Sequence, residues 1–356
     1  MTRLSNESRT VALALRHLPL AAALAAGALL TACGGGGSGD TPSGSTATPL
    51  SQSDATADAA NSSTTGSDTA AGLDTVVDTT SALAQTVAQA AASAVPGRMQ
   101  AEAASVESSP AAAAPVTNVT VNCAGGGTAT LSITGGSAAS ELNGQLDAGE
   151  TYTVAYAQCT GAAGWAQLNG SVVMEVTAAD HATSPSSFSV NLTATHLALS
   201  LPSGTATLDG TATVARTVTT SNGTTTTTSH VTVPNATLAT AFNARTGSFT
   251  LSDLDATRTL TSVAGVMTAS QYDGHHTLSG TAWGRTFSMT VATDGKLGYD
   301  ATGALVSGAW TVIRPAATIA TTVANGLVVL TVDDGNDGTI DHTWTFPIAQ
   351  LGSAAG

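Results

Sequence analysis

Apolar and polar residues alternate over most of the second half of the chain. In one run, Ala129, Leu131 and Ile133 are separated by Ser and Thr, and similar runs surround Met174, Leu192 and Met289. A period of two residues is typical of a strand that buries one face and exposes the other. We therefore expect residues 116–352 to form an all-β domain.

Short polar dipeptides ending in glycine separate these alternating runs. Asn-Gly and Asp-Gly accept a positive φ and are strong signals of tight hairpins. They begin at residues 143, 169, 209, 222, 273, 294, 325 and 337. The pattern predicts an antiparallel, up-and-down sheet or sandwich built of hairpins, and a single such domain is favoured over two stacked ones.

The segment 33–115 has a different composition. It is rich in Gly, Ser, Thr and Ala, and every Trp, Tyr and Phe of the chain lies between Tyr152 and Phe346. A segment without large apolar groups buries too little surface to offset its ordering entropy, so we expect a low-complexity, disordered tether. Within it, the apolar positions from Leu73 to Val95 have helical spacing and precede Pro96, which favours a transient helix there.

Residues 1–32 have the charge order of a secretory signal. Arg3, Arg9 and Arg16 precede an apolar run from Leu18 to Leu30. That run is too short for a membrane-spanning helix, which needs about 20 apolar residues. We therefore expect residues 1–32 to be a signal peptide that is removed.

The end of this leader, Leu30-Thr31-Ala32-Cys33, resembles the lipobox of bacterial lipoproteins. The resemblance implies lipidation of Cys33 by a diacylglyceryl thioether and an acyl group such as palmitate, which would hold the protein on a membrane. Because Gly34 rather than Asp follows Cys33, it further implies the outer membrane, facing the periplasm or the surface. The alternative is an ordinary signal peptide cleaved nearby, with Cys33 a bystander.

Cys123 and Cys159 are the two other cysteines of the chain. In an oxidising compartment outside the cytoplasm, two thiols most simply form one disulfide. No histidine lies near either of them to activate a thiolate, which favours a structural bridge over a catalytic cysteine.

The chain is acidic. Its formal net charge is −14, and removal of residues 1–32, which carry a net +2, leaves −16. No cluster of Lys and Arg occurs, which argues against nucleic acid as a partner and against electrostatic docking on anionic lipid.

The densest acidic motif runs from Asp333 to Asp341. Calcium prefers hard oxygen ligands, which this segment could supply from residues Asp333, Asp334, Asn336, Asp337 and Asp341. On the EF-hand template, however, Gly335 and Trp344 replace the ligands expected at the third and twelfth positions. A plain hairpin turn with an acidic tip is the favoured interpretation, and a calcium site is the alternative.

No established motif points to catalysis. The histidines are scattered, and the chain has no His-Glu-x-x-His, P-loop or Gly-x-Ser-x-Gly motif. The residues favour a non-enzymatic envelope protein, either a structural module or a binding module whose tryptophans meet a protein or glycan. A calcium-stabilised adhesin and, behind it, a hydrolase are the alternatives. The whole layout resembles uncharacterised β-rich outer-membrane lipoproteins of proteobacteria, which supply no activity to carry over.

Overall fold

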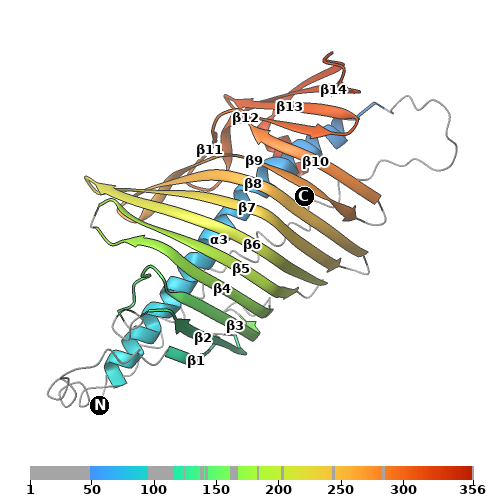
Figure 1. Cartoon of the computed structure of the whole chain (residues 1–356). Coiled ribbons are helices and arrows are strands. Elements are labelled where there is room, and N and C mark those ends of the chain that lie inside the picture. Colours follow the sequence, from blue (N-terminus) through green and yellow to red (C-terminus); the bar gives the residue numbers. More distant parts are fainter. Residues whose placement is uncertain are drawn as a thin grey trace. The chain divides into compact units, whose positions relative to one another are not determined.

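The protein is built on one antiparallel sheet, and its structure is a computed structural model (Figure 1). It describes residues 49–94, 116–123, 125–136, 140, 143–160, 167–182, 184–201, 204–242, 245–282 and 285–354. Fifteen strands form the sheet, with hydrogen-bonded neighbours following chain order except that β11 pairs with β9 and β12. The elements are α3 (Gln52–Ala94), β1 (Val116–Asn122), β2 (Thr128–Thr134), β3 (Thr151–Thr160), β4 (Gln167–Asp180), β5 (Ser186–Leu201), β6 (Gly204–Ser221), β7 (Thr224–Phe242), β8 (Arg245–Val263), β9 (Val266–Ala282), β10 (Arg285–Thr293), β11 (Leu297–Tyr299), β12 (Leu305–Arg314), β13 (Ala317–Ala324), β14 (Leu327–Asp334), β15 (His342–Pro347) and α6 (Ile348–Ala354).

The alternation that predicted strands is the alternation that buries side chains. In β2, Ala129, Leu131 and Ile133 are buried while the Ser and Thr residues between them are partly exposed. Strand β13 repeats the pattern, with Ile319 buried on the same face as Thr321 and Val323. The predicted all-β, antiparallel hairpin fold is confirmed, in the form of a sheet.

Several connections are the tight hairpins that the dipeptides predicted. Asn222-Gly223 joins β6 to β7 and Asn325-Gly326 joins β13 to β14, and all four residues have a positive φ between 52° and 77°. Two successive residues with a positive φ are typical of the type I′ turn, whose twist agrees with that of the flanking strands. Ala264-Gly265 makes the same kind of turn between β8 and β9, with φ values of 52° and 80°.

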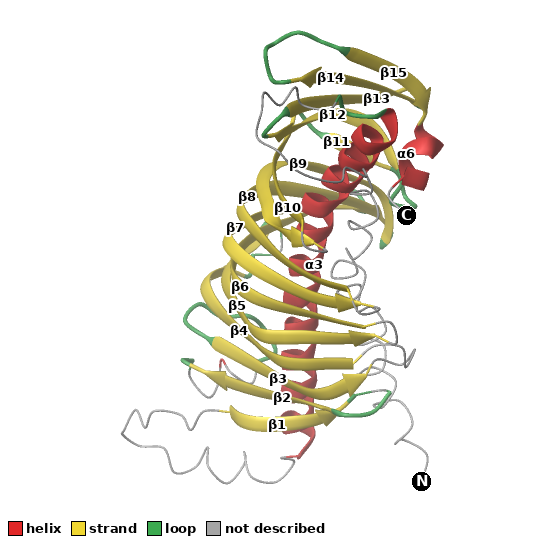
Figure 2. Ribbon diagram, turned by 90° about the vertical axis from the view of Figure 1, so that its right-hand side faces the viewer, coloured by secondary structure: helices red, strands yellow, loops and turns green. Residues whose placement is uncertain are grey.

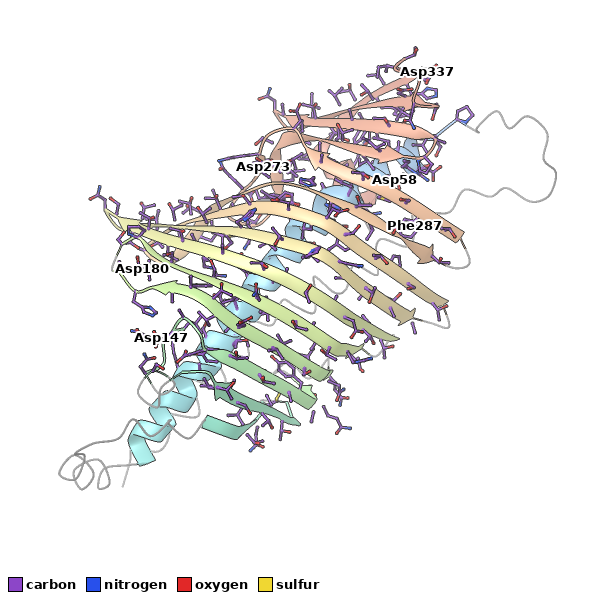
Figure 3. All side chains as sticks on the ribbon, in the orientation of Figure 1. Asp58, Asp147, Asp180, Asp273, Phe287 and Asp337 are labelled. Carbon is purple, nitrogen blue, oxygen red and sulfur yellow. A yellow bond between two sulfur atoms is a disulfide. The ribbon has the colours of Figure 1, made fainter. Side chains whose placement is uncertain are left out.

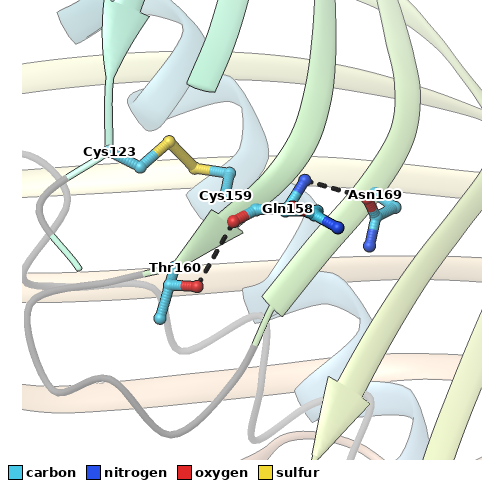
Figure 4. Close-up of a disulfide and its surroundings, with 5 residues drawn as sticks. All are labelled: Cys123, Gln158, Cys159, Thr160 and Asn169. Carbon is cyan, nitrogen blue, oxygen red and sulfur yellow. Dashed lines mark hydrogen bonds between the residues drawn. A yellow bond between two sulfur atoms is a disulfide. The ribbon is translucent and has the colours of Figure 1, made fainter. Parts of the chain in front are cut away.

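Three of the dipeptides lie inside strands, which corrects the expectation of a hairpin at each. Asn169-Gly170 is in β4, Asp209-Gly210 in β6 and Asp273-Gly274 in β9. The Asn169 side chain accepts a hydrogen bond of 2.8 Å from the backbone N–H of Gln158, which has a φ of 51° (Figure 4). The ladder shifts register beside Gly170, so this glycine marks a β-bulge, not a turn.

The Asp209 carboxylate makes the matching contact in the next bulge. It accepts a hydrogen bond of 2.7 Å from the backbone N–H of His196, whose φ is 46°. In both places a short polar side chain satisfies the backbone group that the bulge removes from the ladder. The sequence signal for a positive φ was sound, but it does not distinguish a turn from a bulge.

Helix α3 corrects the expectation for part of the predicted tether. Residues 52–94 form a helix of 43 residues that ends at Ala94, two residues before Pro96, as the helical spacing after Leu73 indicated (Figure 2, red). The hydroxyl of Ser51 caps the helix by accepting a hydrogen bond from the backbone N–H of Asp54. The rest of the expected tether, 33–48 and 95–115, lies outside the described residues.

Small side chains explain how this helix is buried without large apolar groups. Every residue from Ala55 to Ser63 is buried. The hydroxyls of Thr56, Ser62 and Ser63 donate to carbonyl oxygens three or four residues earlier, at 2.7–2.9 Å. These bonds remove the cost of about 1–3 kcal/mol for burying an unbonded hydroxyl.

The described residues form two compact units, and helix α3 and strand β6 contribute to both. The first contains residues 72–94 and 116–217, and its largest fully buried side chains are Leu131, Ile133, Tyr152, Met174 and Leu197. The second contains residues 49–71 and 218–354, and its largest are Leu254, His276, Leu297, Trp310, Ile319 and Leu330.

The predicted disulfide between Cys123 and Cys159 is confirmed (Figure 4). Their Cα atoms are 5.4 Å apart, within the usual range for a bridge. The bond joins the end of β1 to β3 across a sequence separation of 36 residues, so it ties the first strand of the sheet to the third.

We predict that the double substitution Cys123→Ala and Cys159→Ala lowers the free energy of unfolding by about 3 to 4 kcal/mol, because the unfolded chain regains the entropy of an open loop. Urea unfolding of both forms, measured without reductant, checks this. The wild type in reductant should match the variant, and a loss below about 1 kcal/mol would contradict a stabilising bridge.

Candidate functional site

In the first unit, helix α3 carries a buried ion pair with the sheet. Arg216 of β6 donates to the carboxylates of Asp74 and Asp78, at 2.7 Å in the Asp74 pair. Arg216 and Asp74 are 9% and 6% exposed, whereas Asp78 is 64% exposed. Burial alone would lower the pKa of Arg216, but the two carboxylates outweigh burial and raise it. The guanidinium also lies 5.3 Å from the centre of the Phe188 ring, which adds a cation–π contact.

In the second unit, three side chains of the sheet bond to the helix. Arg314 of β12 donates to the carboxylate of Asp58, the Trp310 ring N–H donates to the carbonyl of Ala59 at 3.1 Å, and the Tyr299 hydroxyl donates to that of Ser63 at 3.4 Å. Burial raises the pKa of Asp58, and the charge of Arg314 opposes that change. The labelled Asp58 lies on the helix in Figure 3.

Two polar side chains of β9 lie under the helix at Gly66. Tyr272 and His276 are 3% and 2% exposed, and neither the Tyr272 hydroxyl nor the His276 ring nitrogens have a hydrogen-bond partner among the described residues. A Cβ on Gly66 would lie 2.1 Å from the Tyr272 hydroxyl oxygen, so only glycine fits at this point of the helix. We call the contacts of Arg216, Arg314, Trp310, Tyr299, Tyr272 and His276 with α3 the helix seam.

Burial keeps Tyr272 and His276 uncharged. It raises the pKa of Tyr272, and it lowers the pKa of His276 to about 4, assisted by the neighbouring His275. His275 and His276 directly follow Asp273-Gly274, where the sequence predicts a hairpin; they lie instead within β9, with His275 exposed on the opposite face. The sequence pattern does not predict the burial of Tyr272 and His276, because Gly66, against which both side chains lie, is more than two hundred residues away in the sequence.

The acidic segment between β14 and β15 is arranged as a turn (Figure 3, near the labelled Asp337). Asp333 accepts hydrogen bonds from the backbone N–H groups of Asp337 and Gly338, at 3.1 and 2.8 Å. Asp341 accepts one from the N–H of Asp334, at 2.7 Å, and Asp337 one from Thr339.

The two remaining candidate ligands of this segment also bond to the protein. The Asn336 side chain bonds to Thr318 and to the carbonyl of Arg314, and Asp334 accepts the backbone N–H of Leu50 at 3.1 Å. Across the described parts of the chain, no three His, Cys, Asp or Glu side chains are grouped so as to hold a metal ion. The contacts are those of a hairpin turn, and the calcium hypothesis for Asp333 to Asp341 stays a prediction.

The remaining candidate residues of the sequence are Cys33 and the four tryptophans. Cys33 lies outside the described residues, as do Trp165 and Trp283. Trp310 is buried in the helix seam, and Trp344 is partly buried and stacks on the ring of His342, with ring centres 5.2 Å apart. The structure therefore does not bring the tryptophans it describes into one exposed aromatic surface.

Comparison with known proteins gives no match: no family model, no curated protein and no solved structure is similar to this chain. Among the described residues, no helix is both long and apolar enough to cross a membrane.

We predict that Arg216→Met lowers the free energy of unfolding by about 3 to 5 kcal/mol, because it removes the guanidinium that is bonded to the buried Asp74 carboxylate. The double variant Arg216→Met with Asp74→Asn should recover most of that loss. Asp78→Asn is the matched control, since its side chain is exposed and should change stability by less than about 1 kcal/mol. Urea unfolding checks all three; equal stability of the wild type and Arg216→Met would show that the pair is not buried in solution.

We predict that His276 weakens the fold in acid. Its pKa is about 4 in the folded state against 6.5 for an ordinary histidine, so the unfolded chain binds the proton first as the pH falls. Stability is therefore full above pH 6.5 and is lost progressively down to pH 4, by about 3 kcal/mol. Unfolding of the wild type and of His276→Leu at pH 7.5, 6, 5 and 4 tests this, because the other groups contribute equally to both. The variant should gain on the wild type with each step into acid, and parallel profiles would contradict a buried neutral imidazole.

Proposed function

We propose that this chain is a lipid-anchored protein of the bacterial cell envelope, held on the outer membrane, whose β sheet is a structural or binding module without a catalytic role. The observation that carries the proposal is the sequence Leu30-Thr31-Ala32-Cys33 at the end of a basic and then apolar leader. The disulfide between Cys123 and Cys159 supports it, because such bonds persist in compartments outside the cytoplasm.

The contact of Leu50 with Asp334 indicates where the anchor would join the folded protein. Leu50 precedes helix α3, and its N–H bonds to the carboxylate at the end of β14. Leu50 is only 17 positions after Cys33 in the sequence. That length spans about 60 Å at full extension and about 23 Å as a random coil. On this proposal, the lipid would keep the second unit close to the membrane, on a linker much shorter than the 33–115 tether expected from composition.

The helix seam supports a structural role for the sheet. Arg216 and Arg314 are bonded to carboxylates of the helix, and Trp310 is bonded to its backbone. Side chains that hold two elements together in this way give rigidity to the surface around them. A protein or glycan partner of the envelope would bind such a rigid sheet at little cost in ordering.

We predict that the wild-type protein, produced in a Gram-negative bacterium, incorporates labelled palmitate and fractionates with the outer membrane. Cys33→Ser should abolish the label and release the protein into the soluble envelope fraction, because no acyl chain remains to hold it. Cys123→Ser is the matched cysteine control and should keep its label. Label on the Cys33→Ser protein, or a soluble wild type, would overturn the proposal.

A further inference from the structure

The loop before β3 surrounds a buried carboxylate. Glu150 is 0% exposed, and its Oε2 accepts hydrogen bonds from the backbone N–H of Asp147, at 3.0 Å, and from the Tyr152 hydroxyl. Its other oxygen, Oε1, has no donor among the described residues. A buried carboxylate oxygen without a partner is costly, and a bound cation is one of the few groups that would satisfy it.

Other oxygens of the same loop lie close to the Tyr152 hydroxyl, which donates to Glu150, or to Asp147, whose N–H bonds to Glu150. The Tyr152 hydroxyl lies 2.9 Å from the carbonyl oxygen of Gln145, so that carbonyl and the Glu150 carboxylate converge on one hydroxyl. The Asp147 carboxylate contacts the Asn143 amide at 2.6 Å and the His181 ring at 2.9 Å. Figure 3 labels Asp147 of this loop.

The spacing of these residues matches the second part of an EF-hand calcium loop. That loop binds calcium through side chains at its fifth, ninth and twelfth positions and a backbone carbonyl at its seventh, with glycine at the sixth for a sharp turn. Asn143, Gly144, Gln145, Asp147 and Glu150 stand at those positions in order. Gly144 has the positive φ, 74°, that such a turn requires.

We propose that the loop from Asn143 to Glu150 binds a calcium ion through the side chains of Asn143, Asp147 and Glu150 and the carbonyl oxygen of Gln145. Glu150 would bind with both oxygens, which the flexible coordination of calcium accepts more readily than the strict octahedron of magnesium. With few charged ligands, the site belongs with the weak calcium sites of extracellular proteins, whose Kd is about 10⁻⁴ to 10⁻³ M. This site does not depend on lipidation of Cys33.

Calcium at this loop would stabilise the start of β3. The backbone of Glu150 and Gly149 bonds to Val176 of β4, at 2.8 Å in each direction. An ion that holds Glu150 therefore also holds the loop against this pair of strands, and it stabilises the folded protein by mass action.

The acidic turn at Asp333 to Asp341 differs from this loop in one decisive respect. Oxygens of both loops accept N–H groups of their own loop, as Asn143 Oδ1 does from Gln145, but none of the oxygens of the acidic turn is buried without a partner among the described residues. Although it holds more carboxylates, it offers no orphaned oxygen to a cation. The two loops are therefore matched test and control sites within one chain.

The experiment is a calcium titration of the full mature chain, followed by calorimetry and by the melting temperature. Terbium serves as a second probe, because Tyr152 would transfer its excitation to an ion bound at Glu150. We expect saturable binding of one calcium ion, a rise in melting temperature, much weaker binding of magnesium, and terbium emission that calcium displaces. Asp147→Asn should weaken calcium binding at least tenfold, whereas Asp337→Asn should leave it unchanged.

Two further variants keep the outcome decisive. Glu150→Gln should abolish binding, and if it fails to fold, Asp147→Asn carries the test, because the Asp147 side chain is 26% exposed. Tyr152→Phe should lose terbium emission but still bind calcium. Absence of saturable binding at millimolar calcium overturns the proposal, as does binding that survives in Asp147→Asn. Binding lost only in Asp337→Asn would place the ion at the C-terminal turn instead.

Discussion

Burial of the polar helix α3 is the constraint on which the rest of the structure depends. Nine consecutive residues from Ala55 to Ser63 are buried, and this stretch includes Asp58 and several hydroxyls. Burying such a helix is unfavourable unless each polar group finds a partner. The fold meets this requirement in two ways: hydroxyls bond back to the helix, and the sheet supplies Arg314 to Asp58 and Arg216 to Asp74. The apolar contribution then comes from the sheet, where Trp310, which bonds to the carbonyl of Ala59, is fully buried.

The sheet was predictable from its sequence because the signal for a strand is local. A period of two residues decides which face is buried, and Asn-Gly decides where the chain can reverse, as at residues 222 and 325. The same local signal fails at Asn169 and Asp209. At these two positions the polar side chain accepts the backbone N–H of a residue on the neighbouring strand, Gln158 for Asn169 and His196 for Asp209, and the result is a bulge. Only the pairing of strands distinguishes the two outcomes.

The helix and its seam could not be predicted in the same way because their stability is not local. The prediction from composition considered only the apolar surface that residues 52–94 could bury by themselves, and that surface is small. That prediction did not include the partners that the sheet provides. One of them is Arg216, which bonds to Asp74 although the two residues are 142 positions apart in the sequence. The pair of Tyr272 and His276 was missed for the same reason, since their burial depends on the absence of a side chain at Gly66. The disulfide was predictable because, on the expectation that Cys33 carries lipid, only two cysteines remain to pair.

The two acidic loops show why the number of carboxylates is a poor guide to a cation site. Between β14 and β15, several Asp residues are crowded into one turn, and the turn consumes their oxygens by capping its own N–H groups. Before β3, the carboxylates are fewer, but the start of the strand carries Glu150 into the interior, and one oxygen arrives there without a donor. The buried oxygen without a donor destabilises the folded state, so another favourable interaction must offset that cost. A cation is the partner that the neighbouring amide, carbonyl and carboxylate oxygens are chemically suited to share, and for this reason the sparser loop is the better candidate.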